Sequence, residues 1–435
     1  MRDIRCRTSL RRHSFRLRVR DEAASAESLG ASATHDDKTK SQKIVMVKCI
    51  AILGSTGSIG RSTLRVIDAL GPAYQVVALS AHTSVELLAE QTKRYKPKLI
   101  AISNAACEKQ LRNLVGGLDV KISAGPESLI ELAQSDDADI VLTAIVGVAG
   151  LPAVLAAAKK GKRLAIANKE SLVVAGELLT RAVRENDCTI LPVDSEHSAI
   201  FQAMQAGPRE QVSRIILTGS GGPFRQASIE DIENVTPEQA LAHPVWNMGP
   251  KITIDSATMM NKALEVIEAR WLFDMPAEKI DVLIHPQSIV HSLVEFVDGS
   301  VIAQLGTPDM CLPIQYALTY PQRVAGISKH LRLDELGKLT FERPNVKMFR
   351  ALPLGYEVAR NGGTAAAVFN AANEAAVEEF LAGRIRFVSI VELIEHCLNK
   401  HNIKHTASLE ELLEADAWAR KEVKQRAQKH KSVRA

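Results

Sequence analysis

From about residue 48, short apolar runs alternate with segments whose apolar residues recur every three or four positions. The runs are rich in β-branched residues and predict strands at 48–53, 75–80, 98–103, 139–145, 163–168 and 189–194. The segments between them predict helices, among them 62–70, 84–95 and 151–161. This alternation indicates an α/β fold with a parallel, doubly wound, Rossmann-like sheet. Ligands of such sheets gather at the carboxyl ends of the strands.

The pattern changes after residue 200, where strands mix with glycine-rich turns at 214–224, 281–296 and 300–310. This mixture predicts a central α+β domain. Helical periodicity dominates the last part of the chain, most clearly at 365–383 and 408–428. We therefore expect a Rossmann-like domain at 46–193, a central domain at 194–320, a linker at 321–345 and a helical bundle at 346–435.

The first 45 residues differ in composition from the rest of the chain. Eight arginines crowd residues 2–20, alanines and serines follow, and no apolar run like that of a secretory signal is present. We expect residues 1–45 to be a disordered basic tail. It is either an organellar transit peptide or the product of a start codon upstream of Met46.

Composition and charge narrow the class of protein. A chain of 435 residues needs more than one core, and a net charge of +4 is too small to suggest a nucleic-acid-binding surface. Six scattered cysteines without a C-x-x-C pair fit reduced thiols in a cytoplasm. The uncharged stretch 140–158 is long enough to cross a membrane, but Gly147, Gly150 and Pro152 interrupt it. We interpret it as a strand, a loop and the start of a helix, and expect no membrane segment.

The stretch "ILGSTGSIGRSTL" follows the first predicted strand and places Gly54, Gly57 and Gly60 before a helix. A strand, a glycine loop and a helix are the context in which backbone amides bind a pyrophosphate. The alternative is a tight turn without a ligand. The second strand ends in "AHTS" (81–84) and lacks the acid that NAD-binding proteins usually carry there. The absence of an acid at the end of the second strand therefore favours NADP over NAD.

Asp194 and Glu196 flank Ser195 at the end of the last predicted strand. In an extended chain, residues two apart lie on the same side, so both carboxylates could bind one hard cation. The alternative is that Asp194 or Ser195 caps a helix.

The segment 255–273 predicts one amphipathic helix, whose polar stripe contains Thr258, Asn261, Lys262 and Glu265. A third carboxylate from this stripe would complete a metal site, and its Asn and Lys side chains suit hydroxyls or phosphate. An exposed helix face is the alternative.

Two further loops carry candidate chemistry. The loop "LTGSGGPF" (217–224) can form an anion-binding nest around Ser220, or a plain hairpin turn. The loop "AHPVWNMGPK" (242–251) contains His243 and Trp246, and its aromatic residue belongs either to a lid or to the core.

Taken in order, these motifs resemble the 1-deoxy-D-xylulose 5-phosphate reductoisomerase family in its bacterial form. The resemblance runs from about Val47 to the end of the chain and includes "LGSTGSIG", "ANKES", "PVDSEH", "HPVWNMG", "NKALEVIEARWLF", "IHPQSIVHS" and "AQLGTPDM". It implies conversion of 1-deoxy-D-xylulose 5-phosphate to 2-C-methyl-D-erythritol 4-phosphate, with NADPH and Mg²⁺ or Mn²⁺, in the non-mevalonate route to isoprenoids.

The resemblance also implies roles for particular residues. The metal ligands would be Asp194, Glu196 and Glu265, and these three, with Lys169 and His243, would be catalytic. Substrate contacts would come from Lys169, Ser195, Glu196, Ser220, His243, Ser256, Asn261, Lys262 and Glu265, and Trp246 matches the aromatic residue of the family's flap. NADPH contacts would come from Thr56, Gly57, Ser58, Ile59, His82, Thr83, Ser84, Asn168, Glu170 and Gly249.

One turn departs from the family, because His82-Thr83-Ser84 lacks the lysine that many bacterial relatives place near the 2′-phosphate. We expect a sugar phosphate substrate, a homodimer and a cytoplasmic location, with an organelle as the alternative if the tail is a transit peptide. Another NADP-dependent oxidoreductase, of the semialdehyde-dehydrogenase or dihydrodipicolinate-reductase type, or an NADP-sensing regulator would leave "DSE" and "NKALE" unexplained.

Overall fold

The computed structural model describes residues 47–246 and 248–432. They belong to one compact unit, Met46–Ala435, and the predicted tail at 1–45 lies outside the described residues. The first sheet is entirely parallel, has the order β4-β3-β2-β1-β5-β6-β7, and confirms the predicted α/β fold. Its strands are β1 (Lys48–Leu53), β2 (Tyr74–Ala81), β3 (Leu99–Ile102), β4 (Lys121–Ala124), β5 (Ile140–Thr143), β6 (Arg163–Ile166) and β7 (Ile190–Pro192).

The edge strand β4 was not predicted from the sequence. It has only four residues, Lys-Ile-Ser-Ala, and none of them is fully buried. A short, half-exposed edge strand therefore leaves no apolar run in the sequence.

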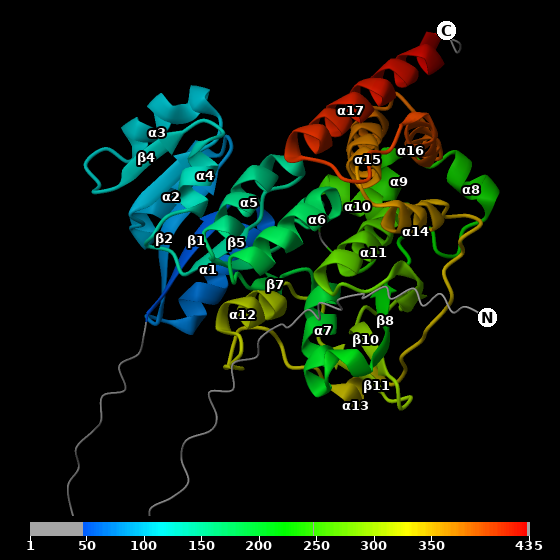
Figure 1. The fold of residues 1–435 in the computed structure, drawn as a ribbon, viewed down its shortest axis with the longest axis horizontal. Helices are drawn as coiled ribbons and strands as arrows, with labels where there is room; N and C mark the ends of the chain where they lie inside the picture. Colours follow the sequence, from blue (N-terminus) through cyan, green and yellow to red (C-terminus); the bar gives the residue numbers. More distant parts are fainter. Residues whose placement is uncertain (1–46, 247, 433–435) are drawn as a thin grey trace, which may run out of the picture. The chain divides into compact units, whose positions relative to one another are not determined.

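Helices connect these strands, as Figure 1 shows in blue to green. They are α1 (Ser58–Leu70), α2 (Val85–Tyr95), α3 (Glu108–Leu114), α4 (Ser128–Ala133), α5 (Leu151–Lys159) and α6 (Lys169–Glu185). The uncharged stretch 140–158 forms β5, a loop and most of α5, as predicted. Among the described residues, no helix is long and apolar enough to cross a membrane.

The second sheet has the order β11-β10-β8-β9, from β8 (Val212–Gly219), β9 (Ile280–Ile284), β10 (Val290–Phe296) and β11 (Val301–Leu305). Helix α7 (Ser195–Ala203) packs on β10 and β11, and α11 (Met260–Leu272) contacts β8, β9 and α6. The other helices of this region are α8 (Ile229–Glu233), α9 (Pro237–Leu241), α10 (Pro250–Ala257) and α12 (Cys311–Thr319). Although α12 falls within 194–320, it packs on α1, β6 and β7 of the first sheet.

The prediction of one helix over 255–273 is wrong. Met259 adopts φ +61°, a left-handed conformation that ends α10 and starts α11. The polar stripe of α11 is not an exposed face either, because Lys262 and Glu265 are buried. Amphipathic periodicity could not distinguish a solvent face from a buried polar site.

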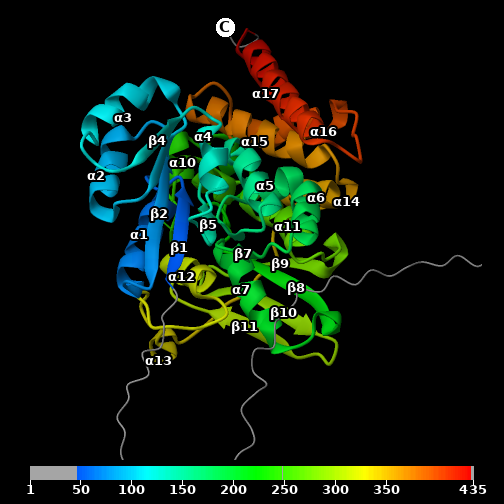
Figure 2. The same ribbon diagram turned by 60° about the vertical axis from the view of Figure 1, so that its left-hand side comes forward.

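Residues 321–345 are irregular apart from the short α13 (Leu333–Leu336) and an isolated antiparallel bridge between Glu342 and Ile284 of β9. The predicted helical region follows as α14 (Ala351–Asn361), α15 (Ala365–Leu381), α16 (Ser389–Lys400) and α17 (Leu409–Ser432). Helix α15 packs against α16, α17 and α6, and α14 packs against α11. Figure 2 shows α14 to α17 in orange to red. The C-terminal helices therefore contact the helices that carry several candidate site residues.

Candidate active site

The glycine loop joins β1 to α1 at the carboxyl edge of the first sheet. Gly54 has φ +86°, and a Cβ there would lie 2.6 Å from the Ala144 carbonyl oxygen. A Cβ on Gly60 would lie 2.3 Å from the Gly54 carbonyl oxygen, so both glycines permit close packing. Gly57 is exposed at the start of α1, and its nearest atom would be 3.6 Å from a Cβ. The amides that begin α1 are thus accessible to an anion.

The other predicted cofactor residues lie mostly at the same edge. Thr56, Ser58 and Ile59 belong to the glycine turn, His82, Thr83 and Ser84 are exposed after β2, Asn168 and Glu170 begin α6, and Gly249 begins α10. The buried Asn168 is fixed by a 2.8 Å hydrogen bond from Thr143 and donates one of 2.6 Å to Ser171. The His82 ring is 2.9 Å from the Ser103 hydroxyl.

Asp194, Glu196 and Glu265 each contribute a carboxylate oxygen to a group whose atoms lie within 4.8 Å of one another. Asp194 immediately precedes α7, Glu196 lies in its first turn, and Glu265 lies in α11. The expectation of an extended chain at 194–196 is therefore wrong, because the turn into α7 brings the carboxylates together. Within the described residues Asp194 makes no capping hydrogen bond. An all-oxygen set of this kind fits a hard divalent cation such as Mg²⁺ or Mn²⁺.

The buried Lys169 reaches this cluster from the start of α6. Its Nζ lies 2.5 Å from Asp194 and 3.5 Å from Glu265, and it donates a 2.9 Å hydrogen bond to the side-chain oxygen of Asn261. Burial disfavours the charged ammonium, but the two carboxylates outweigh it and hold the pKa of Lys169 well above its usual range. Lys169 is therefore a fixed cation beside the metal candidates.

Lys262 is a second buried cation, on α11. Its Nζ lies 2.6 Å from Glu265 and 3.0 Å from Glu196, and it donates to the Thr218 carbonyl oxygen at 2.5 Å. Burial opposes its charge, but Glu196 and Glu265 raise its pKa. Lys262 therefore joins the metal candidates to the end of β8.

The charges in this cluster do not balance. Lys169 and Lys262 supply two positive charges, against three carboxylates. Burial, and then the charge of Glu196, raise the pKa of Glu265 to about 8. One proton on Glu265 would make the five groups neutral, and a divalent cation would replace that proton.

The loop after β8 forms a nest, with φ +83° at Gly221 and +69° at Gly222. The alternative of a hairpin turn is wrong, because the loop leads into α8 and the sheet partners of β8 are β9 and β10. The Ser220 hydroxyl accepts a 3.2 Å hydrogen bond from the Gly222 amide. A Cβ on Gly222 would lie 2.6 Å from the Ser256 carbonyl oxygen, so the loop lies directly against α10 at Ser256. Both glycines are buried, and positive φ at two consecutive residues is a backbone conformation that can form an anion-binding nest.

His243 connects this nest to the segment that contains Trp246. Its Nδ1 accepts the backbone N–H of Trp246 at 2.9 Å, so the proton is assigned to Nε2, which lies 3.1 Å from the Ser220 hydroxyl. Burial lowers the pKa of His243 and favours this neutral form. Trp246 is only half-buried, which favours the lid interpretation over a core anchor.

We expect acid to release this segment. The folded-state pKa of His243 is below its ordinary value, so the unfolded chain binds more protons, and stability falls as the pH decreases through about 6.5. A proton on Nδ1 also removes the acceptor of the Trp246 amide. Acrylamide quenching of tryptophan fluorescence should increase from pH 7 to pH 5.5 in the native protein. His243→Gln should abolish most of this change, and an identical change in that variant would contradict the assignment.

Sequence reasoning missed a second buried group behind the metal candidates. His197 Nδ1 lies 3.4 Å from Glu268, and its Nε2 lies 3.0 Å from the Glu265 backbone oxygen. Asp194, His197 and Glu268 also place ligand atoms within 4.8 Å of one another. Burial raises the pKa of Glu268 to about 7. Two features of the sequence could have indicated this group. His197 lies within "DSEHS", and Glu268 follows Glu265 by one helical turn.

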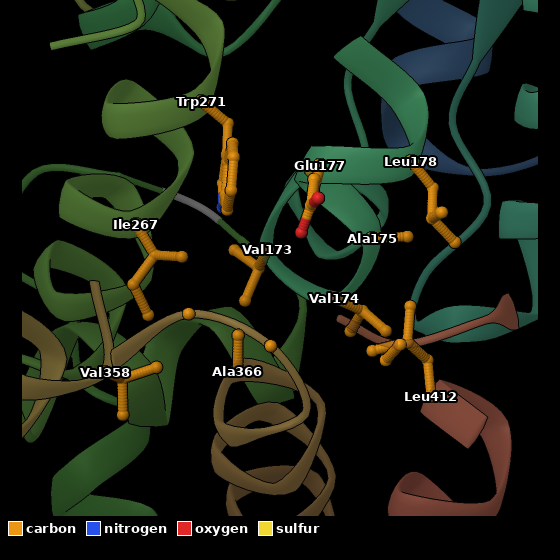
Figure 3. Close-up of a pocket in the computed structure, with 14 residues that line it drawn as sticks. Val173, Val174, Ala175, Glu177, Leu178, Ile267, Trp271, Val358, Ala366 and Leu412 are labelled. Atoms are coloured by element: carbon orange, nitrogen blue, oxygen red, sulfur yellow. The ribbon is translucent and has the colours of Figure 1, made fainter. Parts of the chain in front are cut away.

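A separate, small pocket lies where α6 is broken at Ala175. Figure 3 shows Trp271 and Ile267 of α11 on one side with Val173 of α6 beside them, and Val174 next to Leu412 of α17. The lining is largely apolar and contains none of the predicted site residues among those described. The convergent polar groups, rather than this pocket, mark the candidate active site.

Comparisons with known proteins identify the family. Family models described as 1-deoxy-D-xylulose 5-phosphate reductoisomerase, its C-terminal domain and a further C-terminal domain match residues 50–176, 190–273 and 305–422. A 1-deoxy-D-xylulose 5-phosphate reductoisomerase of Chloroherpeton thalassium is 51% identical over 88% of this chain and 98% of its own length. The 1-deoxy-D-xylulose 5-phosphate reductoisomerase of Clostridium perfringens is 49% identical over 87% of this chain and 98% of its own length.

Solved structures are similar over the same range. The Zymomonas mobilis reductoisomerase in complex with NADPH has a TM-score of 0.81 and 44% identity, over 88% of this chain and 99% of that one. A reductoisomerase in complex with NADPH, fosmidomycin and magnesium has a TM-score of 0.84 and 43% identity, over 88% of this chain and 98% of that one.

Proposed function

Because the chain belongs to the 1-deoxy-D-xylulose 5-phosphate reductoisomerase family, we propose which of its side chains carry out the family's reaction. The protein is an NADPH-dependent oxidoreductase. With a divalent metal, it rearranges and reduces 1-deoxy-D-xylulose 5-phosphate to 2-C-methyl-D-erythritol 4-phosphate, a step of isoprenoid biosynthesis. The observation that carries the assignment is the convergence of three carboxylates and two buried ammonium groups.

We assign Asp194, Glu196 and Glu265 as the metal ligands. The metal, when bound, stabilises negative charge on substrate oxygens while a carbon–carbon bond is broken and remade. Lys169 places a fixed positive charge beside the same oxygens and is the residue best placed to hold or move a proton there. Ser195, whose hydroxyl donates to Glu196 at 2.6 Å, is a neighbouring substrate contact.

The substrate phosphate is assigned to the nest after β8. Phosphate oxygens would be bound by Ser220 and Ser256. His243 orients the Ser220 hydroxyl, and Ser256 lies where α10 meets the nest. Asn261 and Lys262 would bind the adjoining hydroxyls. The segment with Trp246 would close over the site and exclude water from the aldehyde intermediate.

NADPH supplies the hydride, and its diphosphate would lie on the amides of Thr56, Gly57, Ser58 and Ile59 at the start of α1. Asn168, Glu170 and Gly249 would contact the nicotinamide half, which brings the cofactor toward Lys169. The exposed turn His82-Thr83-Ser84 would meet the 2′-phosphate.

The direct test is to follow NADPH absorbance with 1-deoxy-D-xylulose 5-phosphate and Mg²⁺ or Mn²⁺, and to identify the product. Oxidation that needs all three components supports the assignment. Equal oxidation after removal of the metal with a chelator would contradict the metal role of the carboxylates.

Cofactor selectivity is expected to be weaker than in lysine-bearing relatives. Thr83 and Ser84 can offer neutral hydrogen bonds of about 0.5–1.5 kcal/mol, whereas a charged donor contributes about 1.5–3 kcal/mol. Thr83→Lys should therefore increase the preference for NADPH over NADH roughly tenfold, mainly through the NADPH KM. Gln75→Lys, at the exposed opposite end of β2, is the matched control and should change neither value. A wild-type preference for NADH would contradict this assignment.

We also propose a homodimer, supported by β11, an edge strand of the described second sheet with 47% of Val301 and 38% of Ile302 exposed. Light scattering after size exclusion tests it. The five cysteines of the described residues are free, which supports the cytoplasm over an oxidising compartment. The boundaries 46–193, 194–320, 321–345 and 346–435 remain our proposed domain limits.

A further inference from the structure

The loop from Ala144 to Gly150, after β5, lies between two parts of the proposed cofactor site. On one side the Ala144 carbonyl oxygen would lie 2.6 Å from a Cβ on Gly54 of the glycine loop. On the other, a Cβ on Gly150 would lie 3.3 Å from the side-chain nitrogen of Asn168. Any displacement of this loop therefore disturbs both the glycine loop and Asn168.

The outer side of this loop rests on a carboxylate from the C-terminal helices. Gly147 has φ +75°, and a Cβ there would lie 3.3 Å from both carboxylate oxygens of Glu374 on α15. Glu374 in turn accepts hydrogen bonds from Arg420 of α17 at 2.6 Å and from Asn370 at 3.0 Å. Arg420 is held by Asp416 at 2.6 and 3.0 Å. Two helices thus fix this carboxylate against the backbone of the loop.

Helix α15 also reaches the other cofactor elements. Asn373, one residue before Glu374, donates a 2.8 Å hydrogen bond to Asp255 of α10. Asp255 pairs at 2.7 Å with Lys251, which also lies 3.6 Å from Glu170 at the start of α6. Helix α15 is therefore connected to α10 and α6 as well as to the loop after β5.

We propose that Glu374 and Arg420 are positioning residues for NADPH binding, through the loop Ala144–Gly150. The inference rests on the cofactor site proposed above and gives the C-terminal helices a part in it. Arg420 also neutralises Glu374, which would otherwise place an unpaired negative charge near a cofactor that carries a diphosphate and a 2′-phosphate.

The test uses Glu374→Ala, which leaves the Arg420–Asp416 pair in place. Its matched control is Glu395→Ala, which removes the Arg350–Glu395 pair between α14 and α16. We expect the NADPH Kd, measured by fluorescence in the full chain, to increase about tenfold in Glu374→Ala and to stay within twofold in the control. Without NADPH, amide exchange at 144–150 should be faster in Glu374→Ala only. Glu374→Gln, which can still accept from Arg420, should restore most of the affinity.

Gly147→Ala disturbs the same contact from the side of the loop and should also weaken NADPH binding. The test therefore does not depend on one variant. Folded Glu374→Ala and Gly147→Ala proteins with the wild-type Kd would overturn the inference while leaving the proposed function intact. A wild-type protein that binds no NADPH would contradict both.

Discussion

Glu265→Gln is expected to reduce kcat about a thousandfold while the NADPH Kd stays within twofold of the wild-type value. The lost effect is the charge stabilisation that a tightly held divalent cation gives substrate oxygens. This is typically worth several kcal/mol, and about 4 kcal/mol corresponds to a thousandfold change in rate. Steady-state kinetics at saturating NADPH measure the loss of kcat, and a Mn²⁺ titration measures the loss of metal affinity.

The same variant should fold normally without metal. Burial and the charge of Glu196 raise the pKa of Glu265 to about 8, and glutamine resembles the neutral form of the side chain that this environment favours. Glu108→Gln, which removes an exposed pair with Arg112 on α3, is the matched control and should change neither kcat nor Mn²⁺ affinity. Near-normal activity of Glu265→Gln at low magnesium would show that the three-carboxylate site is wrong.

Asp194→Asn and Glu196→Gln should also abolish turnover, with one difference. Asp194 is 2.5 Å from Lys169, and although burial opposes its ionisation, that ammonium lowers the pKa of Asp194. Asp194→Asn removes the carboxylate charge nearest to the buried Lys169 ammonium, and the loss of such a partner typically costs about 3–5 kcal/mol of folding stability. Thermal unfolding should therefore separate Asp194→Asn from Glu265→Gln even where both are inactive.

The sequence predicted much of the fold because the strongest elements carry the strongest patterns. Six of the seven parallel strands are apolar runs, whereas β4 is short and half-exposed and has no such pattern. The break at Met259 could not be predicted, because nothing in its side chain requires a left-handed backbone. The position of α12 on the first sheet depends on tertiary packing that periodicity does not record.

The candidate site was predicted as motifs but not as geometry. Residues 194–196 were expected to be extended, and a turn into α7 is what brings Asp194 and Glu196 to Glu265. The ammonium groups of Lys169 and Lys262 arrive from different helices, a meeting that no local pattern encodes. Glu374 was missed because it is one of three glutamates in an alanine-rich helix, and its position against Gly147 is what distinguishes it.

Lys169→Met is expected to lower kcat by about 10²–10³ and, unlike Glu265→Gln, to leave Mn²⁺ bound at least as tightly as in the wild type. The kinetic loss is that expected when one preorganised cation is removed from a reacting oxygen. The opposite effect on the metal follows from the contacts: the Lys169 ammonium is paired with Asp194 and Glu265, two of the oxygens a cation would use. Its removal ends that competition and leaves an excess of negative charge.

Lys160→Met is the matched control, because it removes an exposed lysine whose partner, Asp136, is also exposed. It should alter neither kcat nor Mn²⁺ affinity. Without metal, Lys169→Met should unfold at a lower temperature than the wild type, because its buried carboxylates have lost a cation, and Mn²⁺ should recover much of that loss. If Lys169→Met instead bound Mn²⁺ as weakly as Glu265→Gln does, the lysine would be organising the metal ligands, and its assignment as a group that acts on substrate would be wrong.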